Sequence, residues 1–302
     1  MRPDLSVCIA GVTLKNPVMT ASGTFGSGKE YGAFFDISRL GAVVTKGIAP
    51  VPWKGNPVPR VAETPSGMLN AIGLQGPGVD TFMAEDLPYL AQYDVPVIAN
   101  VCGHSEEEYL TVVEKLSDTD VSMLEINVSC PNVREGGIAF GTDPGKVCAI
   151  TQAVKKITKK PVIIKLSPNV TDIRETAKAA EAGGADCVSL INTLIGMKID
   201  VRTRRFILAN RTGGLSGPAI HPVAVRMVYD VSHAVGIPVI GMGGISTAED
   251  ALEMILAGAT GIAVGTAFFH DPQAAVKVIE GMEVYLAEQK ISSVRELVGA
   301  VS

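Results

Sequence analysis

Short apolar runs recur along the chain, separated by loops and by longer amphipathic segments. The apolar residues in eight of these runs are continuous rather than alternating with polar ones, as in parallel strands that are covered on both faces. We therefore predict strands over residues 17–20, 42–45, 96–100, 123–128, 161–166, 186–191, 238–241 and 261–264.

The amphipathic segments between these runs carry helix-terminal signals. Ser105 and Glu108 have the spacing of a capping box, Pro144 suits a first helical turn, and Gly183 provides a helix stop. Eight strands alternating with helices predict an α/β protein, a single-domain (β/α)8 TIM barrel over residues 1–302, with a doubly wound open sheet as the alternative. Helices are predicted over residues 105–117, 144–158, 171–182, 222–235, 247–257 and 272–289.

Three further segments stand outside this alternation. An apparent β-hairpin over residues 7–14 precedes the first strand, and we expect it to plug the bottom of the barrel. The connections 46–79 and 192–219 are too long to be plain turns, and both follow the C-terminal ends of strands, where barrel enzymes carry their chemistry. The basic stretch 198–211 is expected to be a solvated hairpin, with a substrate lid or a protein interface as alternatives.

Composition excludes several classes of protein. Hydrophobic residues make up 47% of the chain, which suffices for a sizeable core, and the net charge of −5 opposes a nucleic-acid partner. No run reaches the roughly 20 apolar residues of a membrane span, and the N-terminus has no signal-peptide pattern, so we expect a cytoplasmic protein without a membrane partner. The five cysteines and four histidines lack the spacing of a disulfide framework or a metal site.

Glycine-rich turns end the last two predicted strands. Gly243 and Gly244 follow the seventh strand and precede a helix, and Gly265 and Thr266 follow the eighth. Glycine lets backbone N–H groups approach a phosphate, and a helix N-terminus adds a positive dipole. This pair of loops is a recurring phosphate site in barrels, so we expect it to bind a phosphate of either the substrate or a cofactor.

Cys130 follows the fourth predicted strand, within residues 127–132 (NVSCPN). A thiol with an ordinary pKa of about 8.5 can act as a nucleophile or as a general base. A cysteine nucleophile normally has a histidine base beside it, and none of the four histidines ends a predicted strand. The general-base role is therefore favoured.

Lysine, asparagine and threonine side chains lie at the C-terminal ends of the predicted strands or in the loops that follow them. A lysine that points into a barrel mouth is costly unless it meets an anion, and asparagines can donate to and accept from a flat, amide-rich ring. These positions predict a site for a planar anionic ligand. They are Lys46, Asn70, Asn100, Asn127, Lys165, Asn192 and Thr193.

Several motifs, in this order and over nearly the whole chain, resemble those of the dihydroorotate dehydrogenases: residues 45–47 (TKG), 55–60 (GNPVPR), 70–74 (NAIGL), 127–132 (NVSCPN) and 241–244 (GMGG). In having cysteine at position 130 the chain resembles the class 1 enzymes, because the membrane-linked class 2 enzymes have serine there. Residues 60–68 (RVAETPSGM) and 132–137 (NVREGG) are similar to the catalytic subunit of class 1B.

The resemblance implies an FMN enzyme that oxidises dihydroorotate to orotate in pyrimidine biosynthesis. It also implies that electrons pass to NAD through a partner subunit carrying FAD and a 2Fe-2S cluster, with a homodimer of this chain inside a heterotetramer. The alternatives are a class 1A enzyme that uses fumarate, another dihydropyrimidine-type flavin oxidoreductase, a flavin-free lyase or isomerase on the same fold, and a barrel that is only a scaffold.

The resemblance also implies roles for individual residues. The catalytic set is Cys130 as the base for C5 of dihydroorotate, Lys46 near the substrate carboxylate, and Lys165 near the reduced flavin. The implied FMN contacts are Ser22, Lys46, Gly47, Asn100, Asn127, Lys165, Ile191 and Gly217, with Gly243, Gly244, Gly265 and Thr266 at the phosphate. The implied substrate contacts are Lys46, Asn70, Ala71, Ile72, Gly73, Leu74, Asn127, Asn192 and Thr193.

Overall fold

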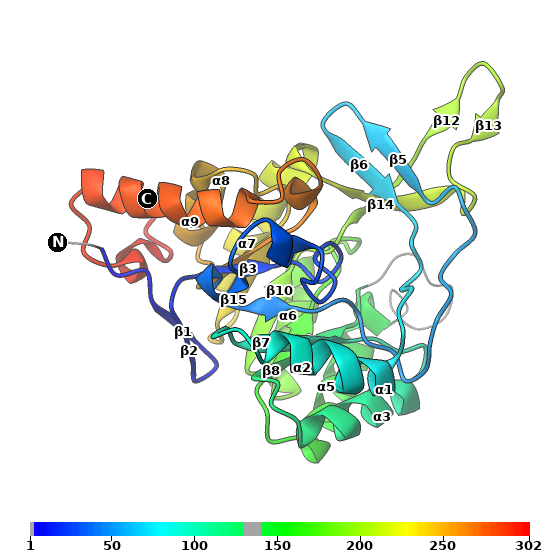
Figure 1. Ribbon diagram of the computed structural model, residues 1–302, viewed down its shortest axis with the longest axis horizontal. Helices are drawn as coiled ribbons and strands as arrows, with labels where there is room; N and C mark the ends of the chain where they lie inside the picture. Colours follow the sequence, from blue (N-terminus) through cyan, green and yellow to red (C-terminus); the bar gives the residue numbers. More distant parts are fainter. Residues whose placement is uncertain (1–2, 130–139) are drawn as a thin grey trace.

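The structure is a computed structural model that describes residues 3–129 and 140–302. Its central sheet is an eight-stranded parallel barrel with the strand order β3-β16-β15-β10-β9-β8-β7-β4 (Figure 1). All eight predicted barrel strands are confirmed. They are β3 (Val18–Thr20), β4 (Val43–Val44), β7 (Val97–Val101), β8 (Met123–Asn127), β9 (Val162–Lys165), β10 (Cys187–Leu190), β15 (Val239–Met242) and β16 (Gly261–Val264).

The two end strands of this sheet, β3 and β4, meet through a short junction that closes the barrel. Met19 forms an isolated parallel bridge with Ala42. Beyond it, the fully buried Thr20 takes the place of a longer ladder, because its Oγ1 accepts from the backbone N–H of Val44 at 2.9 Å and donates to the carbonyl oxygen of Val44 at 3.0 Å. One side chain thus completes the hydrogen bonding between the first and second barrel strands.

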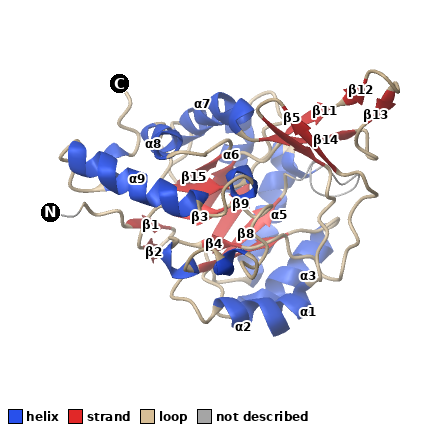
Figure 2. Ribbon diagram, turned by 45° about the horizontal axis from the view of Figure 1, so that its top comes forward, coloured by secondary structure: helices blue, strands red, loops and turns tan. Residues whose placement is uncertain are grey.

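Helices surround the barrel on its outside (Figure 2). Ser105 caps its helix through a bond from the backbone N–H of Glu108, and Thr247 and Asp250 form a capping box. The predicted helices are confirmed, with boundaries that differ by at most three residues. They are α3 (Glu106–Ser117), α5 (Pro144–Ile157), α6 (Ile173–Ala182), α7 (His221–Ser232), α8 (Ala248–Leu256) and α9 (Ala274–Glu288).

The connection between β4 and β7 also contains helical structure that the sequence analysis did not predict. A continuous segment runs through α1 (Val79–Thr81), a π-helical turn (Phe82–Asp86) and α2 (Leu87–Leu90). Its buried residues Val79, Phe82 and Leu90 join the main hydrophobic core. The irregular turn explains why no clean helical period is visible in the sequence.

The N-terminal hairpin lies at the bottom of the barrel, as predicted. Strands β1 (Val7–Ile9) and β2 (Val12–Leu14) pair in antiparallel fashion, and their side chains at Ile9 and Leu14 are fully buried. Gly261 begins β16, and a Cβ at that position would lie 2.7 Å from Cδ1 of Ile9. The glycine therefore makes room for the plug at the N-terminal end of the strands.

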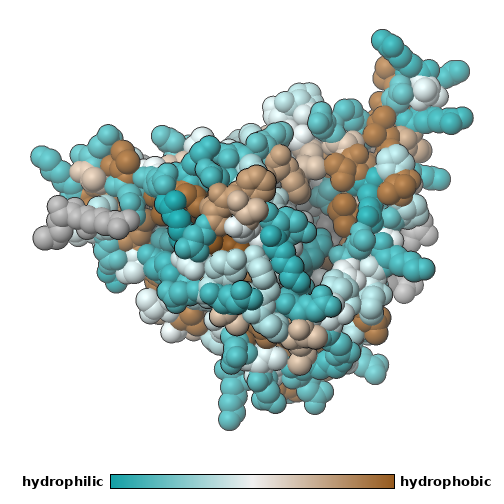
Figure 3. Space-filling view, viewed as in Figure 1, coloured by the Kyte–Doolittle hydropathy of each residue, from teal (hydrophilic) through white to brown (hydrophobic). Residues whose placement is uncertain are grey.

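The two long connections fold together above the barrel, where the sequence analysis expected only loops. They form an antiparallel sheet of β11 (Leu194–Met197), β14 (Thr212–Ser216), β6 (Gly67–Asn70) and β5 (Val61–Thr64). The predicted hairpin within residues 198–211 is confirmed as β12 (Ile199–Asp200) and β13 (Arg205–Phe206), which extend away from the barrel (Figure 1). Figure 3 shows apolar side chains along this extension and hydrophilic ones at its tip.

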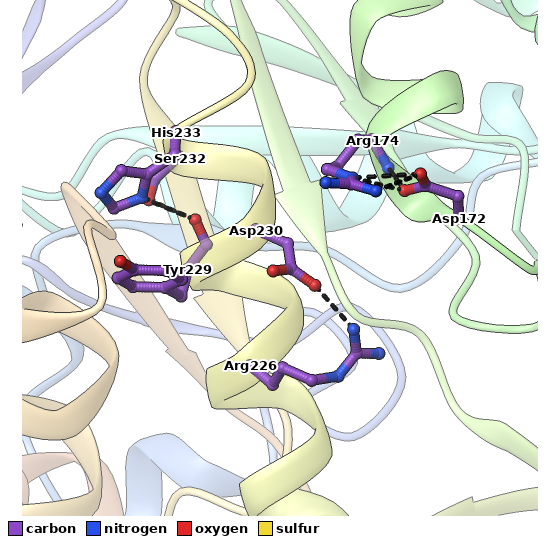
Figure 4. Close-up of polar contacts among 7 residues, drawn as sticks. All are labelled: Asp172, Arg174, Arg226, Tyr229, Asp230, Ser232 and His233. Carbon is purple, nitrogen blue, oxygen red and sulfur yellow. Dashed lines mark hydrogen bonds and ion pairs between the residues drawn. The ribbon is translucent and has the colours of Figure 1, made fainter.

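Polar contacts between residues close in sequence lie at the start of α6 and along α7 (Figure 4). Asp172 caps α6, and hydrogen bonds from the side chain and backbone of Arg174 lower the pKa of Asp172 to about 2. On α7, Arg226 forms an ion pair of 2.6 Å with Asp230, one turn away. Both contacts join residues close in sequence, so each stabilises its own helix.

We predict that Thr20→Val lowers the free energy of unfolding by about 2 kcal/mol, because it leaves the buried N–H of Val44 without its acceptor. Thr20→Ser keeps the hydroxyl and serves as the control. Urea titration measures both variants, and equal unfolding free energies for the two would contradict the closing role of this side chain.

Candidate active site

A cavity of about 320 Å³ opens at the C-terminal ends of the barrel strands, beneath β6 and β14. Its size falls in the usual range for small-molecule pockets, about 300–1,000 Å³. The structure brings together at this cavity nearly every site residue expected from the sequence. These are Ser22, Lys46, Gly47, Asn70, Ile72, Gly73, Leu74, Asn100, Asn127, Lys165, Ile191, Asn192, Thr193, Gly217, Gly243, Gly244, Gly265 and Thr266.

Two expected site residues are not placed at the cavity. Ala71 is fully buried in a separate cluster with Leu69 and Leu208 and does not line the cavity. Its backbone N–H donates to the carbonyl of Arg60 at 2.8 Å. Cys130 lies outside the described residues.

One end of the cavity is built from glycine turns. Gly243 and Gly244 adopt φ angles of 131° and 72°, a region that favours glycine. A Cβ on Gly244 would lie 2.7 Å from Cβ of His221 and 2.8 Å from the carbonyl oxygen of Gly217. Across the cavity, Thr266 Oγ1 donates to Ser216 Oγ at 2.8 Å. Packing thus requires glycine in this turn, and the backbone of the turn lines the cavity, in the place where the sequence predicts a phosphate.

His221 supports the same turn from behind, and the sequence analysis did not single it out. Its Nδ1 lies 2.8 Å from the carbonyl oxygen of Gly243, so Nδ1 carries the hydrogen of this bond. Its Nε2 lies 3.2 Å from Oε2 of Glu253 on α8. The bond from Nδ1 thus ties the glycine turn to the start of α7.

A buried cation lies deeper in the cavity. Lys165, at the end of β9, is 4% exposed, and its Nζ donates to Ser22 Oγ at 3.0 Å. Ser22 follows β3, on a distant part of the barrel wall. Lys46, at the end of β4, is half-buried and also lines the cavity. Two lysines facing one cavity favour an anionic ligand or a ligand that gains negative charge.

Amide groups form a connected arc along the cavity. Nδ2 of Asn127 donates to Oδ1 of Asn100 at 3.4 Å, and Oδ1 of Asn127 accepts from Ser129 Oγ at 2.9 Å. Nδ2 of Asn192 donates to the same hydroxyl at 2.8 Å. The backbone N–H of Thr193 donates to Oδ1 of Asn192 at 2.7 Å. The arc presents donors and acceptors in fixed positions, which suits a flat ring bearing carbonyl and N–H groups.

Other groups at the cavity were not expected from the sequence. Val61 and Met68 come from β5 and β6, whose sheet was not predicted, and Ser216 ends β14. Glu125 lies beneath the cavity in β8. Its signal was visible in the sequence, since it is a charged residue inside the apolar run MLEIN.

The described residues include a deeply buried thiol but no cluster of metal ligands and no helix suited to crossing a membrane. Burial raises the pKa of the Cys187 thiol well above its ordinary value, and the nearby carboxylates Glu125 and Asp186 raise it further, so this thiol is unreactive. Within residues 3–129 and 140–302 no three His, Cys, Asp or Glu side chains are grouped to hold a metal ion. In the same ranges no helix combines the length and apolar character needed to cross a membrane.

Fold and cavity together define a (β/α)8 barrel protein with a phosphate-type loop pair and a lysine- and amide-lined pocket. The family model for dihydroorotate dehydrogenase matches residues 4–286. The chain belongs to the dihydroorotate dehydrogenase family.

Individual relatives agree with this assignment. The chain is 63% identical over 298 residues to the dihydroorotate dehydrogenase B (NAD(+)) catalytic subunit of Lachnoclostridium phytofermentans, and 60% identical to that of Alkaliphilus metalliredigens, each match covering 99% of both chains. The resemblance to class 1B catalytic subunits is thereby confirmed. A solved structure of DHODH from Eimeria tenella in complex with ferulenol is 23% identical, covers 98% of this chain and 88% of that one, and superposes with a TM-score of 0.83, which supports the fold.

We predict that Gly244→Ala weakens FMN binding by about tenfold or more, because a side chain at φ 72° is strained and would collide with the α7 start. Quenching of flavin fluorescence measures the affinity. Gly236→Ala is the matched control, since its Cβ would meet Glu181 Oε1 at an ordinary 3.4 Å. Equal affinities for the two variants would show that the phosphate binds elsewhere.

Proposed function

We propose that this chain oxidises dihydroorotate to orotate with FMN as the immediate electron acceptor, in the synthesis of pyrimidine nucleotides. The observation that carries the proposal is the convergence, in one cavity, of a glycine turn pair, a buried lysine and an arc of amides. A phosphate, a ring that gains negative charge and a flat pyrimidine ring would each find the chemistry that suits it.

The residues present fit FMN. The turn at Gly243 and Gly244 packs against Ala224 and His221 too closely for a Cβ at either position, and its backbone lines the cavity, where a phosphate can approach it. With Gly265 and Thr266 these glycines would hold the phosphate, and the buried ammonium of Lys165 would stabilise negative charge on the reduced ring. Bound FMN would supply two-electron acceptance. The remaining expected contacts are Ser22, Lys46, Gly47, Asn100, Asn127, Ile191 and Gly217.

The substrate would lie on the amide arc. The ammonium of Lys46 would pair with the carboxylate of dihydroorotate, and the amides of Asn127 and Asn192 would fix the ring. Sγ of Cys130 would remove the proton from C5 while the hydride leaves C6. The other expected contacts are Asn70, Ile72, Gly73, Leu74 and Thr193, which line the cavity, and Ala71, which lies behind it.

The electrons would leave through a separate subunit. The relatives are named as catalytic subunits of an NAD(+)-linked enzyme, which supports a division of labour between chains. We assign FAD and a 2Fe-2S cluster to that partner, and we place two copies of this chain in a heterotetramer. NAD is then the final acceptor, in preference to fumarate.

The test of this function is an anaerobic visible spectrum of the purified chain, recorded before and after addition of dihydroorotate. We expect flavin bands that bleach, because the half-reaction needs only this chain and its FMN. A yellow protein whose flavin bands do not bleach would indicate that its substrate is another dihydropyrimidine. A protein that stays colourless when FMN is supplied would contradict the flavin assignment.

We predict that Cys130→Ala slows flavin reduction by roughly 10²–10⁴-fold, the usual contribution of a general base. Stopped-flow absorbance under anaerobic conditions measures the rate. Cys148→Ala, on the partly exposed α5, is the control and should reduce at the wild-type rate. Wild-type rates in the Cys130 variant would remove this residue from the mechanism.

A further inference from the structure

Glu125 is a buried carboxylate for which the proposed chemistry has no direct use. It lies in β8, is 1% exposed and does not line the cavity. Asn127, two residues further along the same strand, does line it. Because residues i and i+2 of a strand share a face, Glu125 points into the barrel one layer below the cavity floor.

Both carboxylate oxygens of Glu125 accept hydrogen bonds from other strands. Oε2 accepts from Nδ2 of Asn100 at 2.5 Å, and Asn100 is its direct register partner on β7. Oε1 accepts from Ser189 Oγ at 2.7 Å. Ser189 lies on β10, with β9 between it and β8, so this second bond spans the barrel interior.

The bond to Asn100 fixes the orientation of its amide. An amide nitrogen can only donate and its oxygen can only accept, so the carboxylate selects the face on which Nδ2 lies. Oδ1 of Asn100 is then turned toward Nδ2 of Asn127. This leaves Oδ1 of Asn127 to accept from the hydroxyl of Ser129, which in turn accepts from Nδ2 of Asn192.

The contact with Glu125 therefore sets the direction of the bonds at the Asn100 end of the arc. Further along, the backbone N–H groups of Ser129 and Thr193 hold the amide oxygens of Asn127 and Asn192. Reversal of the Asn100 amide would place two oxygens of Asn100 and Glu125 against each other and two N–H groups of Asn100 and Asn127 against each other. Each link would become repulsive. Ser129, whose hydroxyl links Asn127 to Asn192, directly precedes Cys130 in the sequence.

We propose that Glu125 is a positioning residue, whose carboxylate fixes the direction of the Asn100 amide and of its bond with Asn127. In this way it orients the amides that meet the flavin and the pyrimidine. This inference rests on the proposed function for the identity of the ligands. A purely structural need is a weaker explanation, because burying a carboxylate is costly and a well-packed apolar residue can often replace it without loss of stability.

Two conservative variants distinguish the hydrogen bond to Asn100 from the negative charge of the Glu125 carboxylate. Glu125→Gln keeps the reach, since its oxygen can accept from Asn100 while its amide donates to Ser189 Oγ. Glu125→Asp keeps the charge but withdraws both oxygens by one methylene. Ser189→Ala is the matched control, because it removes the other bond to the same carboxylate and leaves the contact with Asn100 in place.

Three quantities are measured for each variant: the dissociation constant for FMN by fluorescence quenching, the visible spectrum of bound FMN, and kcat and KM for dihydroorotate. For Glu125→Asp we expect the FMN dissociation constant and the KM each to rise by about tenfold or more, the scale expected when a buried donor loses its acceptor. We also expect a shifted flavin spectrum for this variant. Glu125→Gln and Ser189→Ala should stay within about threefold of wild type in both constants.

The reverse ranking, with Asp near wild type and Gln impaired, would overturn the proposal and assign the role to the charge. Equal FMN affinity and equal spectra across all variants would overturn it as well. If Glu125→Asp does not fold, Glu125→Met takes its place, because an apolar side chain of similar length removes both acceptors and can often replace a buried carboxylate without loss of stability. A rise of about tenfold or more in its FMN dissociation constant, with Glu125→Gln unimpaired, supports the proposal, and wild-type affinity in Glu125→Met overturns it. If the wild-type chain binds FMN but dihydroorotate does not reduce it, the proposed function fails, while the FMN affinities still decide the role of Glu125.

Discussion

The upper interior of the barrel holds polar side chains that cannot reach bulk water, and each therefore needs a partner on another strand. Asn100, Glu125, Lys165 and Ser189 are all less than 5% exposed. Unpaired, such groups would cost free energy in a medium of low dielectric constant. The parallel register satisfies two of them by placing Asn100 beside Glu125. Ser189 reaches the same carboxylate across the interior, and Lys165 reaches the hydroxyl of Ser22. The same register delivers a cation and an amide arc to the cavity.

The cover of the cavity depends on a second pairing, between segments far apart in the sequence. Strand β6 lies in the connection after β4, and β14 lies in the connection after β10, yet they pair directly, with Asn70 opposite Gly214. This pairing places Asn70 and the end of β14 above the barrel mouth. Gly217, the residue after β14, then approaches the glycine turn at Gly244. The two long connections thus form one structure that links the amide side of the cavity to its phosphate side.

The sequence predicts the barrel well, because continuous apolar runs and helix caps are local signals. The barrel strands from β3 to β16 and the helices between them form where these signals lie. It also predicts which residues meet at the cavity, since parallel strands bring their C-terminal ends to one face. The sheet of β5, β6, β11 and β14 could not be predicted as a whole, because its central pair, β6 with β14, joins segments more than a hundred residues apart. Its outer pairs, β5 with β6 and β11 with β14, are local. The positioning role of Glu125 likewise depends on contacts across the interior, although a charge inside an apolar strand is a visible signal.

The central claim is that the barrel register and the two glycine turns hold a flavin and a pyrimidine in one cavity. A crystal structure of the chain with FMN and orotate tests it most directly. The account predicts the flavin phosphate at Gly243, Gly244, Gly265 and Thr266, the orotate carboxylate at Lys46, and its ring on the amides of Asn127 and Asn192. A phosphate bound away from these turns, or an orotate whose carboxylate does not meet Lys46, would contradict it.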